Sequence, residues 1–169
     1  MSKKIILAVL CLFLSVVCFS GIAYSFEEAL NECYEQLLQK YPNVEAIKKQ
    51  FGAEAKWQER TEPSIHDKTL KLQINNMEYP GINIRTLGYT IEGEDRFIIT
   101  LVDVKKAGFV KFGGIDVGSA REDVIKEFGK PQKIEGNKLI FHTDSEYFYI
   151  TFTVDNNKVV EMKFDSYPD

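Results

Sequence analysis

The residues able to do chemistry are few and scattered along this 169-residue chain. Its two histidines, His66 and His142, lie far apart, and neither stands in a short metal-binding spacing or beside a cysteine pair. Ser119 is not part of a G-x-S-x-G nucleophile elbow, and it precedes an apolar helical pattern that predicts a helix cap instead. The sequence therefore predicts no catalytic residue and no enzyme activity.

Two further patterns are similar to ligand-binding loops without meeting their requirements. Gly113, Gly114 and Gly118 precede a helical pattern, as phosphate-binding glycines do, but the lysine and spacing of a Walker motif are missing. The acidic residues at 92–95 and at 155–157 lack the alternating ligands and the distal Glu of an EF-hand loop. We expect ordinary turns at both places, and hence no metal and no cofactor.

Cys33 has two interpretations. Apolar residues recur at intervals of three and four around it, which predicts an amphipathic helix with this stripe: Phe26, Ala29, Leu30, Cys33, Tyr34, Leu37, Leu38 and Tyr41. In the middle of the stripe, Cys33 is expected to be a small buried hydrophobic residue. The alternative is a reactive thiol or an intermolecular disulfide. The other two cysteines lie before residue 26, so the rest of the chain cannot form an internal disulfide.

Residues 1–25 are typical of a signal peptide. Two lysines near the start precede the apolar run 5–19, and Ala23 and Ser25 are small residues at the positions that a signal peptidase reads. Cleavage would make Phe26 the new N-terminus and place the protein in the periplasm or outside the cell, with no membrane insertion afterwards. An uncleaved N-terminal anchor is the alternative, because the apolar stretch approaches the ~20 residues that span a bilayer.

Removal of that segment makes the chain more acidic. Of the 21 basic and 25 acidic residues, 19 basic and 25 acidic remain after residue 25, a net charge of −6. This balance argues against nucleic acid and anionic membrane surfaces as partners. The 144 residues that remain suit one compact domain or two small units that share a core.

The clearest structural signal begins near residue 112. Ser119 and Glu122 form a capping-box pattern in front of a short helix, and Gly129 and Pro131 end it. Three strand patterns separated by turn-forming residues follow: Lys138–His142, Tyr147–Val154 and Lys158–Phe164. A helix followed by an antiparallel meander is therefore expected.

These residues carry a family resemblance. The run from Gly118-Ser119 to Gly129-Lys130-Pro131, followed by strands that close on 159–164, resembles the bacterial envelope module of BamE (SmpA/OmlA)-like proteins and the repeat of beta-lactamase inhibitory protein. The resemblance implies a non-catalytic domain, with helices laid on an antiparallel sheet, that works by protein contact.

The first half of the chain repeats parts of this pattern. A second helix is expected at Val44–Phe51, and its Phe51-Gly52 end matches Phe128-Gly129. Strands are expected at Leu70–Ile74, Ile82–Tyr89 and Arg96–Val104. We therefore predict an α+β fold with helices on one face of an antiparallel sheet, built as two related helix-then-three-strand units, residues 26–107 and 108–169.

Strand alternation predicts which side chains face the helices. Phe148, Ile150, Phe152 and Val154 should point inward, as should Val160, Met162 and Phe164. Phe128 is expected to join Ile150, Phe152 and Phe164 in one core. The other face would carry the candidate protein-binding residues: Tyr147, Tyr149, His142, Ile140 and Lys163.

The predicted function rests on that other face. Exposed tyrosines suit recognition because they offer rigid contact area and a hydroxyl group, although strands also favour tyrosine for packing alone. We expect an exported protein-interaction module with an unidentified protein partner, either an inhibitor or an envelope assembly factor. A carrier of a small apolar ligand is the alternative, and a hydrolase is a more distant one.

Overall fold

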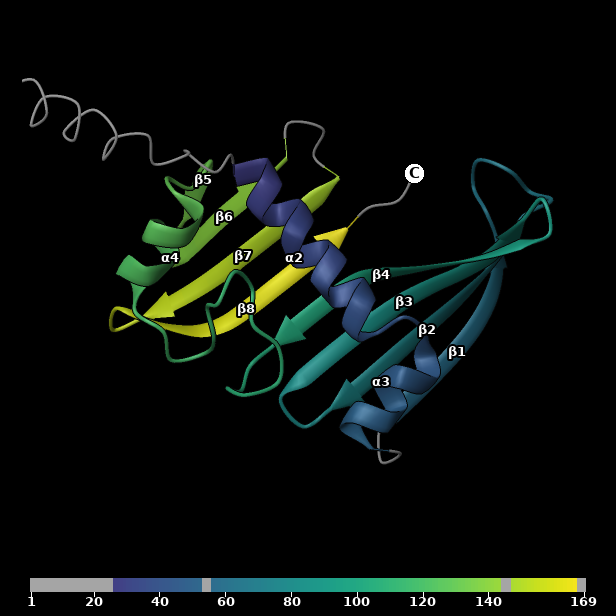
Figure 1. The fold of residues 1–169 in the computed structure, drawn as a ribbon, viewed down its shortest axis with the longest axis horizontal. Helices are drawn as coiled ribbons and strands as arrows, with labels where there is room; N and C mark the ends of the chain where they lie inside the picture. Colours follow the sequence, from purple (N-terminus) through teal and green to yellow (C-terminus); the bar gives the residue numbers. More distant parts are fainter. Residues whose placement is uncertain (1–25, 53–55, 144–146, 167–169) are drawn as a thin grey trace, which may run out of the picture.

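One antiparallel sheet runs through the part of the chain that the structure describes. The computed structural model describes residues 26–52, 56–143 and 147–166. Eight strands lie in the order β1-β2-β3-β4-β8-β7-β6-β5 (Figure 1). Their bounds are β1 Lys56–Pro63, β2 Lys71–Tyr79, β3 Ile82–Ile91, β4 Glu94–Val104, β5 Lys133–Glu135, β6 Lys138–His142, β7 Phe148–Asp155 and β8 Lys158–Ser166.

Three helices lie on the same face of this sheet (Figure 1). They are α2 (Phe26–Lys40), α3 (Val44–Phe51) and α4 (Arg121–Phe128). Each one places an aromatic ring against a strand: Tyr34 of α2 on Phe164 at 5.5 Å, Phe51 of α3 on Tyr79 at 5.3 Å, and Phe128 of α4 on Phe152 at 5.3 Å. The described helices therefore cover one face of a mostly antiparallel sheet.

Local chemistry explains where the helices begin and end. The Asn43 side chain accepts a hydrogen bond from the Ala46 amide at 2.9 Å, which caps α3 as predicted, and Gly52 ends it with φ 90°. The capping box predicted for Ser119 is wrong. Ala120 precedes α4, the Asp123 carboxylate accepts the Ala120 amide, and the Ser119 hydroxyl accepts the Asp116 amide at 3.0 Å.

The predicted division into two helix-then-three-strand units is wrong. Two strands were not expected, β1 and β5, so each half of the chain contributes four strands to one continuous sheet. Both are edge strands, and every side chain along them is exposed. They therefore lack the apolar alternation from which a strand is recognised. The halves join where β4 pairs with β8, and the predicted boundary at residue 107 lies between β4 and α4.

The core lies between the helices and the sheet. Phe128, Ile150, Phe152 and Phe164 belong to one buried cluster, as predicted. One row of this cluster crosses six neighbouring strands, and each of its side chains is fully buried: Phe141, Ile150, Phe164, Val102, Ile84 and Met77. Trp57 continues the row on the edge strand β1, where it is 44% exposed.

The predicted inward row of β8 is partly wrong. Met162 and Phe164 are buried, but Val160 is 40% exposed and Val159 is 1% exposed. A β-bulge explains the change: Thr153 faces Glu161 while Val154 faces Val159, so Val160 has no partner. At the start of β8 the Val159 side chain therefore faces the core, and the Val160 side chain faces away from it.

The predicted signal segment, residues 1–25, lies outside the described residues. Among the helices that the structure does describe, none is long and apolar enough to span a bilayer.

Candidate protein-binding face

The sheet face opposite the helices carries the candidate residues. Antiparallel register places residues from different strands side by side on it, in two parallel rows. The first row crosses β6, β7, β8 and β4 as Ile140, Thr151, Lys163 and Asp103. The second crosses the same strands as His142, Tyr149, Asp165 and Leu101. We call these eight residues, with Tyr147, the open face.

An aromatic pair lies at one side of the open face. The His142 and Tyr149 rings are cross-strand neighbours with centroids 5.5 Å apart. The His142 Nδ1 atom lies 3.0 Å from the Thr143 carbonyl oxygen, which fixes the orientation of the imidazole ring. Both side chains are half-buried. Rings held this way have little rotamer freedom to lose when a partner binds.

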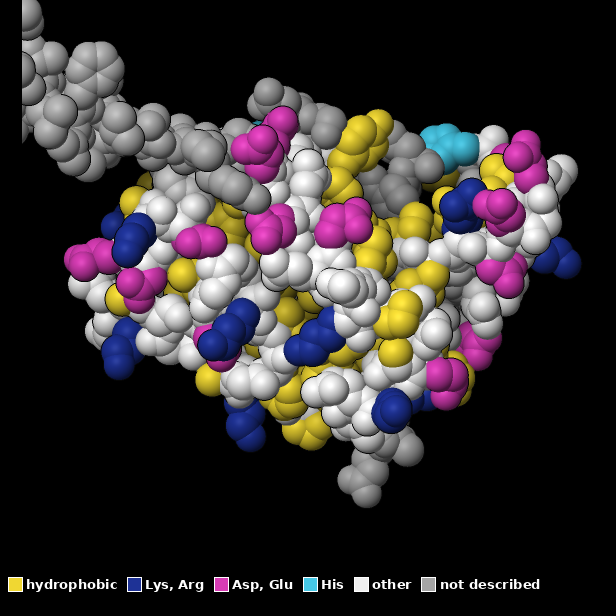
Figure 2. Space-filling model, viewed as in Figure 1, with side chains coloured by type: hydrophobic (Ala, Val, Ile, Leu, Met, Phe, Trp, Pro, Cys, Tyr) yellow, Lys and Arg dark blue, Asp and Glu magenta, His cyan; other side chains and the backbone are white. Residues whose placement is uncertain are grey.

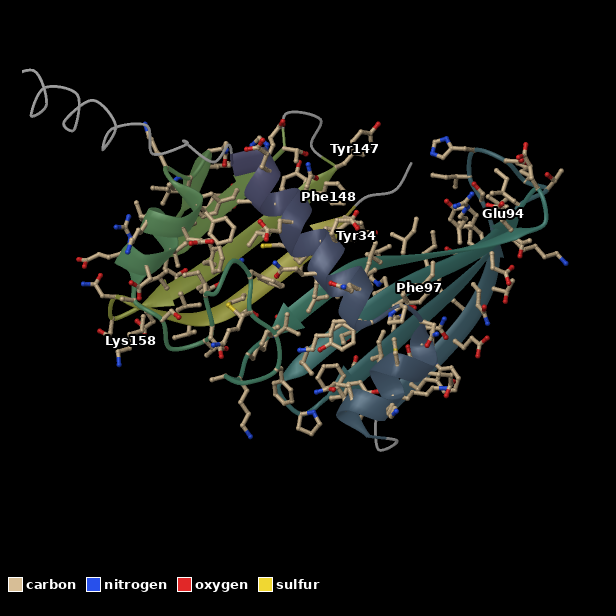
Figure 3. All side chains as sticks on the ribbon, viewed as in Figure 1. Tyr34, Glu94, Phe97, Tyr147, Phe148 and Lys158 are labelled. Carbon is tan, nitrogen blue, oxygen red and sulfur yellow. The ribbon has the colours of Figure 1, made fainter. Side chains whose placement is uncertain are left out.

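Four of the five predicted residues share this face, and Tyr147 lies at its margin. Ile140, His142, Tyr149 and Lys163 occupy adjacent positions in the two rows. Tyr147 precedes β7, is 44% exposed and points outward at the strand end (Figure 3). The prediction that these strands of the second half, β6, β7 and β8, lie side by side therefore agrees with the structure.

The contribution of β4 to this face was not predicted. Leu101 and Asp103 come from the first half of the chain and join the two rows through the pairing of β4 with β8. Leu101 is only 7% exposed although none of the described helices covers it. Nothing local in the sequence encodes such a long-range strand pair. The apolar and polar alternation of β4 was the only available signal.

Opposite charges balance one another across the middle of the face. The Lys105 ammonium lies 3.2 Å from an Asp103 carboxylate oxygen and 3.1 Å from one of Glu161, and Lys163 lies 2.6 Å from Asp165. Burial raises the pKa of the Asp103 carboxyl, and the neighbouring Lys105 offsets part of that rise. For Glu161, burial raises the pKa, but hydrogen bonds from Lys105 and Thr153 outweigh it and leave the pKa lowered.

The absence of enzyme activity stays a prediction. No group of three or more His, Cys, Asp or Glu side chains is arranged there to hold a metal ion. His66 is exposed at the connection between β1 and β2. Cys33 is 4% exposed, as the helical stripe predicted, and burial raises the pKa of its thiol to about 11. Because the thiolate is the reactive form, such a thiol is a poor nucleophile at neutral pH.

Two hollows beside the helices are open grooves. One, of about 640 Å³, lies between the α2–α3 connection and the ends of β3 and β4, and its lining is mixed: Asn43, Glu45, Lys71, Gln73, Asp95, Arg96 and Phe97 among others. A smaller one of about 330 Å³ lies between α2 and the 108–111 segment, with Lys40 and Lys111 in its wall. A carrier of a small apolar ligand needs an enclosed apolar cavity. Neither groove meets that requirement.

The helix-bearing face carries charges of both signs. Figure 2 shows acidic and basic side chains interspersed over the helices, with hydrophobic side chains visible beside α2 over β4. Nucleic-acid-binding surfaces gather basic residues instead. The absence of a nucleic-acid partner stays a prediction.

Comparison with known proteins adds no further constraint. The chain matches no known family model, no curated protein and no solved structure.

Proposed function

We propose that this protein is an exported, non-catalytic binding domain that recognises another protein through the open face. The observation that carries the proposal is the second row, His142, Tyr149, Asp165 and Leu101, on a sheet face that no described helix covers. Protein interfaces are enriched in aromatic side chains, Tyr among them. The open face offers the half-buried ring pair of His142 and Tyr149 at one side, next to the paired charges of Lys163 and Asp165.

Its rigidity supports the same conclusion. The residues of the open face project from paired strands whose other side chains form the core, so their positions are fixed before a partner arrives. Binding then costs little conformational entropy. The chain would act as an inhibitor or an assembly factor, in the periplasm or outside the cell, as its N-terminal segment and its resemblance to envelope modules suggest.

The double variant Tyr147→Ser with Tyr149→Ser tests the proposal. Loss of a central aromatic contact costs binding about 2 kcal/mol or more, a factor of roughly 30 in affinity. The free energy of unfolding should change by about 1 kcal/mol or less, because neither side chain belongs to the buried core. Affinity capture from an extract of the producing cells, with the bound protein then titrated, measures the first quantity. Denaturant melts measure the second.

Trp57→Ser is the matched control. Trp57 is as exposed as Tyr147, 44% in each case, but it lies on β1 at the other end of the sheet and on the helix-bearing side. We expect this variant to capture the same partner with unchanged affinity. Equal capture by the double variant and the wild type would refute the proposal, and loss by Trp57→Ser alone would move the interface to β1.

A further inference from the structure

The strand β4 is paired on both sides along only part of its length. On one side β3 pairs with it from Glu94 to Val104, whereas on the other side β8 pairs only with Leu101–Val104. Among the described residues, no strand pairs with 94–100 on the β8 side. Figure 1 shows β4 continuing well past the end of β8. The middle of the sheet therefore contains a free half-edge.

Hairpin geometry tells which backbone groups that half-edge presents. Glu92 and Gly93 both have positive φ and form a two-residue turn, so Ile91 and Glu94 make a hydrogen-bonded pair. Hydrogen-bonded positions alternate along a strand. Arg96 and Ile98 therefore also bond to β3, and the N–H and C=O groups of Asp95 and Phe97 point away from it.

The contacts of Ile99 confirm this alternation. The Ser166 hydroxyl donates to the Ile99 carbonyl oxygen at 3.2 Å. Burial raises the pKa of the Tyr34 hydroxyl to about 12, and the Ile99 amide beside that hydroxyl offsets part of the rise. Both backbone groups of Ile99 thus point to the β8 side and meet side chains there. Asp95 and Phe97 are the next residues along the same edge.

An aromatic wall lies beside this half-edge. Tyr34 of α2 packs on Phe148 with ring centroids 5.0 Å apart and on Phe164 at 5.5 Å. Figure 3 shows Tyr34, Phe148 and Tyr147 near the start of β7, with Phe97 and Glu94 along β4 beyond them. Tyr34, Phe97 and Phe148 are only partly buried. A strand in line with β8 would therefore place alternate side chains against aromatic rings.

The outer edge of the sheet is protected in a way that this half-edge is not. β1 is an edge strand of eight residues with every side chain exposed, among them Lys56, Glu59, Arg60 and Glu62. Exposed charges along an edge disfavour the addition of a strand. In the free part of β4, by contrast, the charged residues 94–96 give way to the half-buried Phe97 and Ile98.

We propose that an extended segment of a partner protein binds here as an added strand, antiparallel to β4 and collinear with β8. Its backbone would bond to the N–H and C=O groups of Asp95 and Phe97, and its apolar side chains would contact Tyr34 and Phe148. The chain carries a net charge of −4, and along residues 94–96 the carboxylates of Glu94 and Asp95 outnumber the single guanidinium of Arg96, which lies 2.6 Å from Glu94. The segment would therefore alternate apolar with basic residues. This site is separate from the open face and does not depend on it.

A short synthetic peptide is the direct probe. Its six residues alternate valine with lysine, and its ends are acetylated and amidated. When this peptide is added to the full-length protein, hydrogen exchange at the Asp95 and Phe97 amides should slow at least tenfold, and exchange at the β1 amides should not change. Two comparison peptides, one with the same residues in blocks and one N-methylated at alternate amides, should each bind at least tenfold more weakly.

A pair of variants separates backbone pairing from side-chain contact. Asp95→Pro removes the amide that faces the free edge, a position where an edge strand tolerates proline. Asp95→Ala loses the same carboxylate, and with it the bond from Thr90 at 2.7 Å, but keeps the amide. Asp95→Pro should weaken peptide binding at least tenfold relative to Asp95→Ala. If Asp95→Pro does not fold, the exchange measurement on the unmodified chain decides alone.

Three results would overturn the proposal. One is equal binding of the N-methylated and unmodified peptides. Another is exchange at the Asp95 and Phe97 amides that is slow without peptide and becomes slower as the protein concentration is raised, because a second copy of the chain would then occupy the edge. The third is slow exchange without peptide that disappears when residues 167–169 are removed. The double variant Tyr147→Ser with Tyr149→Ser leaves Asp95 and Phe97 intact, so failure of the proposed function would not be mistaken for failure here.

Discussion

The two faces of this sheet are formed by the same strands but differ in burial and in side-chain composition. On the helix-bearing face, a row of apolar side chains crosses the middle of the sheet with no exposure from Phe141 to Met77. On the opposite face, the adjacent row alternates polar and apolar groups, with Asp165 and Leu101 between Tyr149 and Arg85. Burial against helices selects for volume and shape on one side. The described helices impose no such packing constraint on the other side.

Among the tests of this difference between the faces, truncation of a ring on the helix-bearing face should change the free energy of unfolding most. Phe152→Ala should lower the free energy of unfolding by about 3–5 kcal/mol, because the ring is fully buried and packs on Phe128 at 5.3 Å and on Phe141 at 5.9 Å. Urea denaturation followed by circular dichroism measures the loss.

The preceding residue in the chain is the control. Thr151 lies between Ile140 and Lys163 on the open face, and Thr151→Ala should cost about 0.5 kcal/mol or less. Similar losses for Phe152→Ala and Thr151→Ala would mean that the two faces do not differ in packing.

Much of this arrangement could be predicted from residue patterns alone. Asn43, Gly52 and Gly129 mark helix ends through local hydrogen bonds and positive φ, and the structure has those ends. The inward row of β7, with Ile150 and Phe152 at its centre, follows from simple alternation. Short-range signals of this kind depend only on neighbouring residues, so one sequence suffices to detect them.

Features that depend on distant parts of the chain were not predictable in this way. The two halves form one sheet because β4 pairs with β8, some sixty residues later in the chain. The same pairing brings Leu101 and Asp103 to the open face, and no other described residue forms a strand beside Asp95 and Phe97 on that side. No local pattern specifies which strand edges meet, because edge pairing is decided by the global arrangement.

The helix-bearing face should also respond to alkaline pH through Cys33. Burial raises the pKa of this thiol from 9.0 to about 11, so the unfolded chain loses the proton first as the pH rises. The stabilisation is therefore fully present below pH 9 and is lost as the pH rises towards 11, about 2–3 kcal/mol in all. Denaturant melts at pH 8, 9 and 10 measure the slope.

Cys33→Ala isolates this effect. It removes the thiol and should flatten the dependence between pH 8 and 9, before the hydroxyls of Tyr34 and Tyr41, whose ordinary pKa of 10.0 burial raises to about 12 in the folded protein, begin to ionise in the unfolded chain. An unchanged slope in Cys33→Ala would show that the thiol is accessible to water in the folded protein. Rapid labelling of the native thiol at pH 7 would show the same.

The last test concerns the start of β8, where a β-bulge changes which side chains face the core. Val159 and Val160 are neighbours of one type, yet Val159 is 1% exposed and Val160 40% exposed. The Val159 amide donates to the Ser119 carbonyl at 2.9 Å, and its carbonyl accepts the Gly118 amide at 2.7 Å, so the loop before α4 holds Val159 on the core side. Val159→Thr should cost about 1–3 kcal/mol, because it buries a hydroxyl without a partner, whereas Val160→Thr should stay within about 0.5 kcal/mol. Denaturant melts of the pair decide the matter, since both substitutions replace a methyl group of valine with a hydroxyl group. Equal losses would mean that the bulge opposite Val154 does not persist in solution, and a larger loss for Val160→Thr would restore the regular alternation that the sequence predicted.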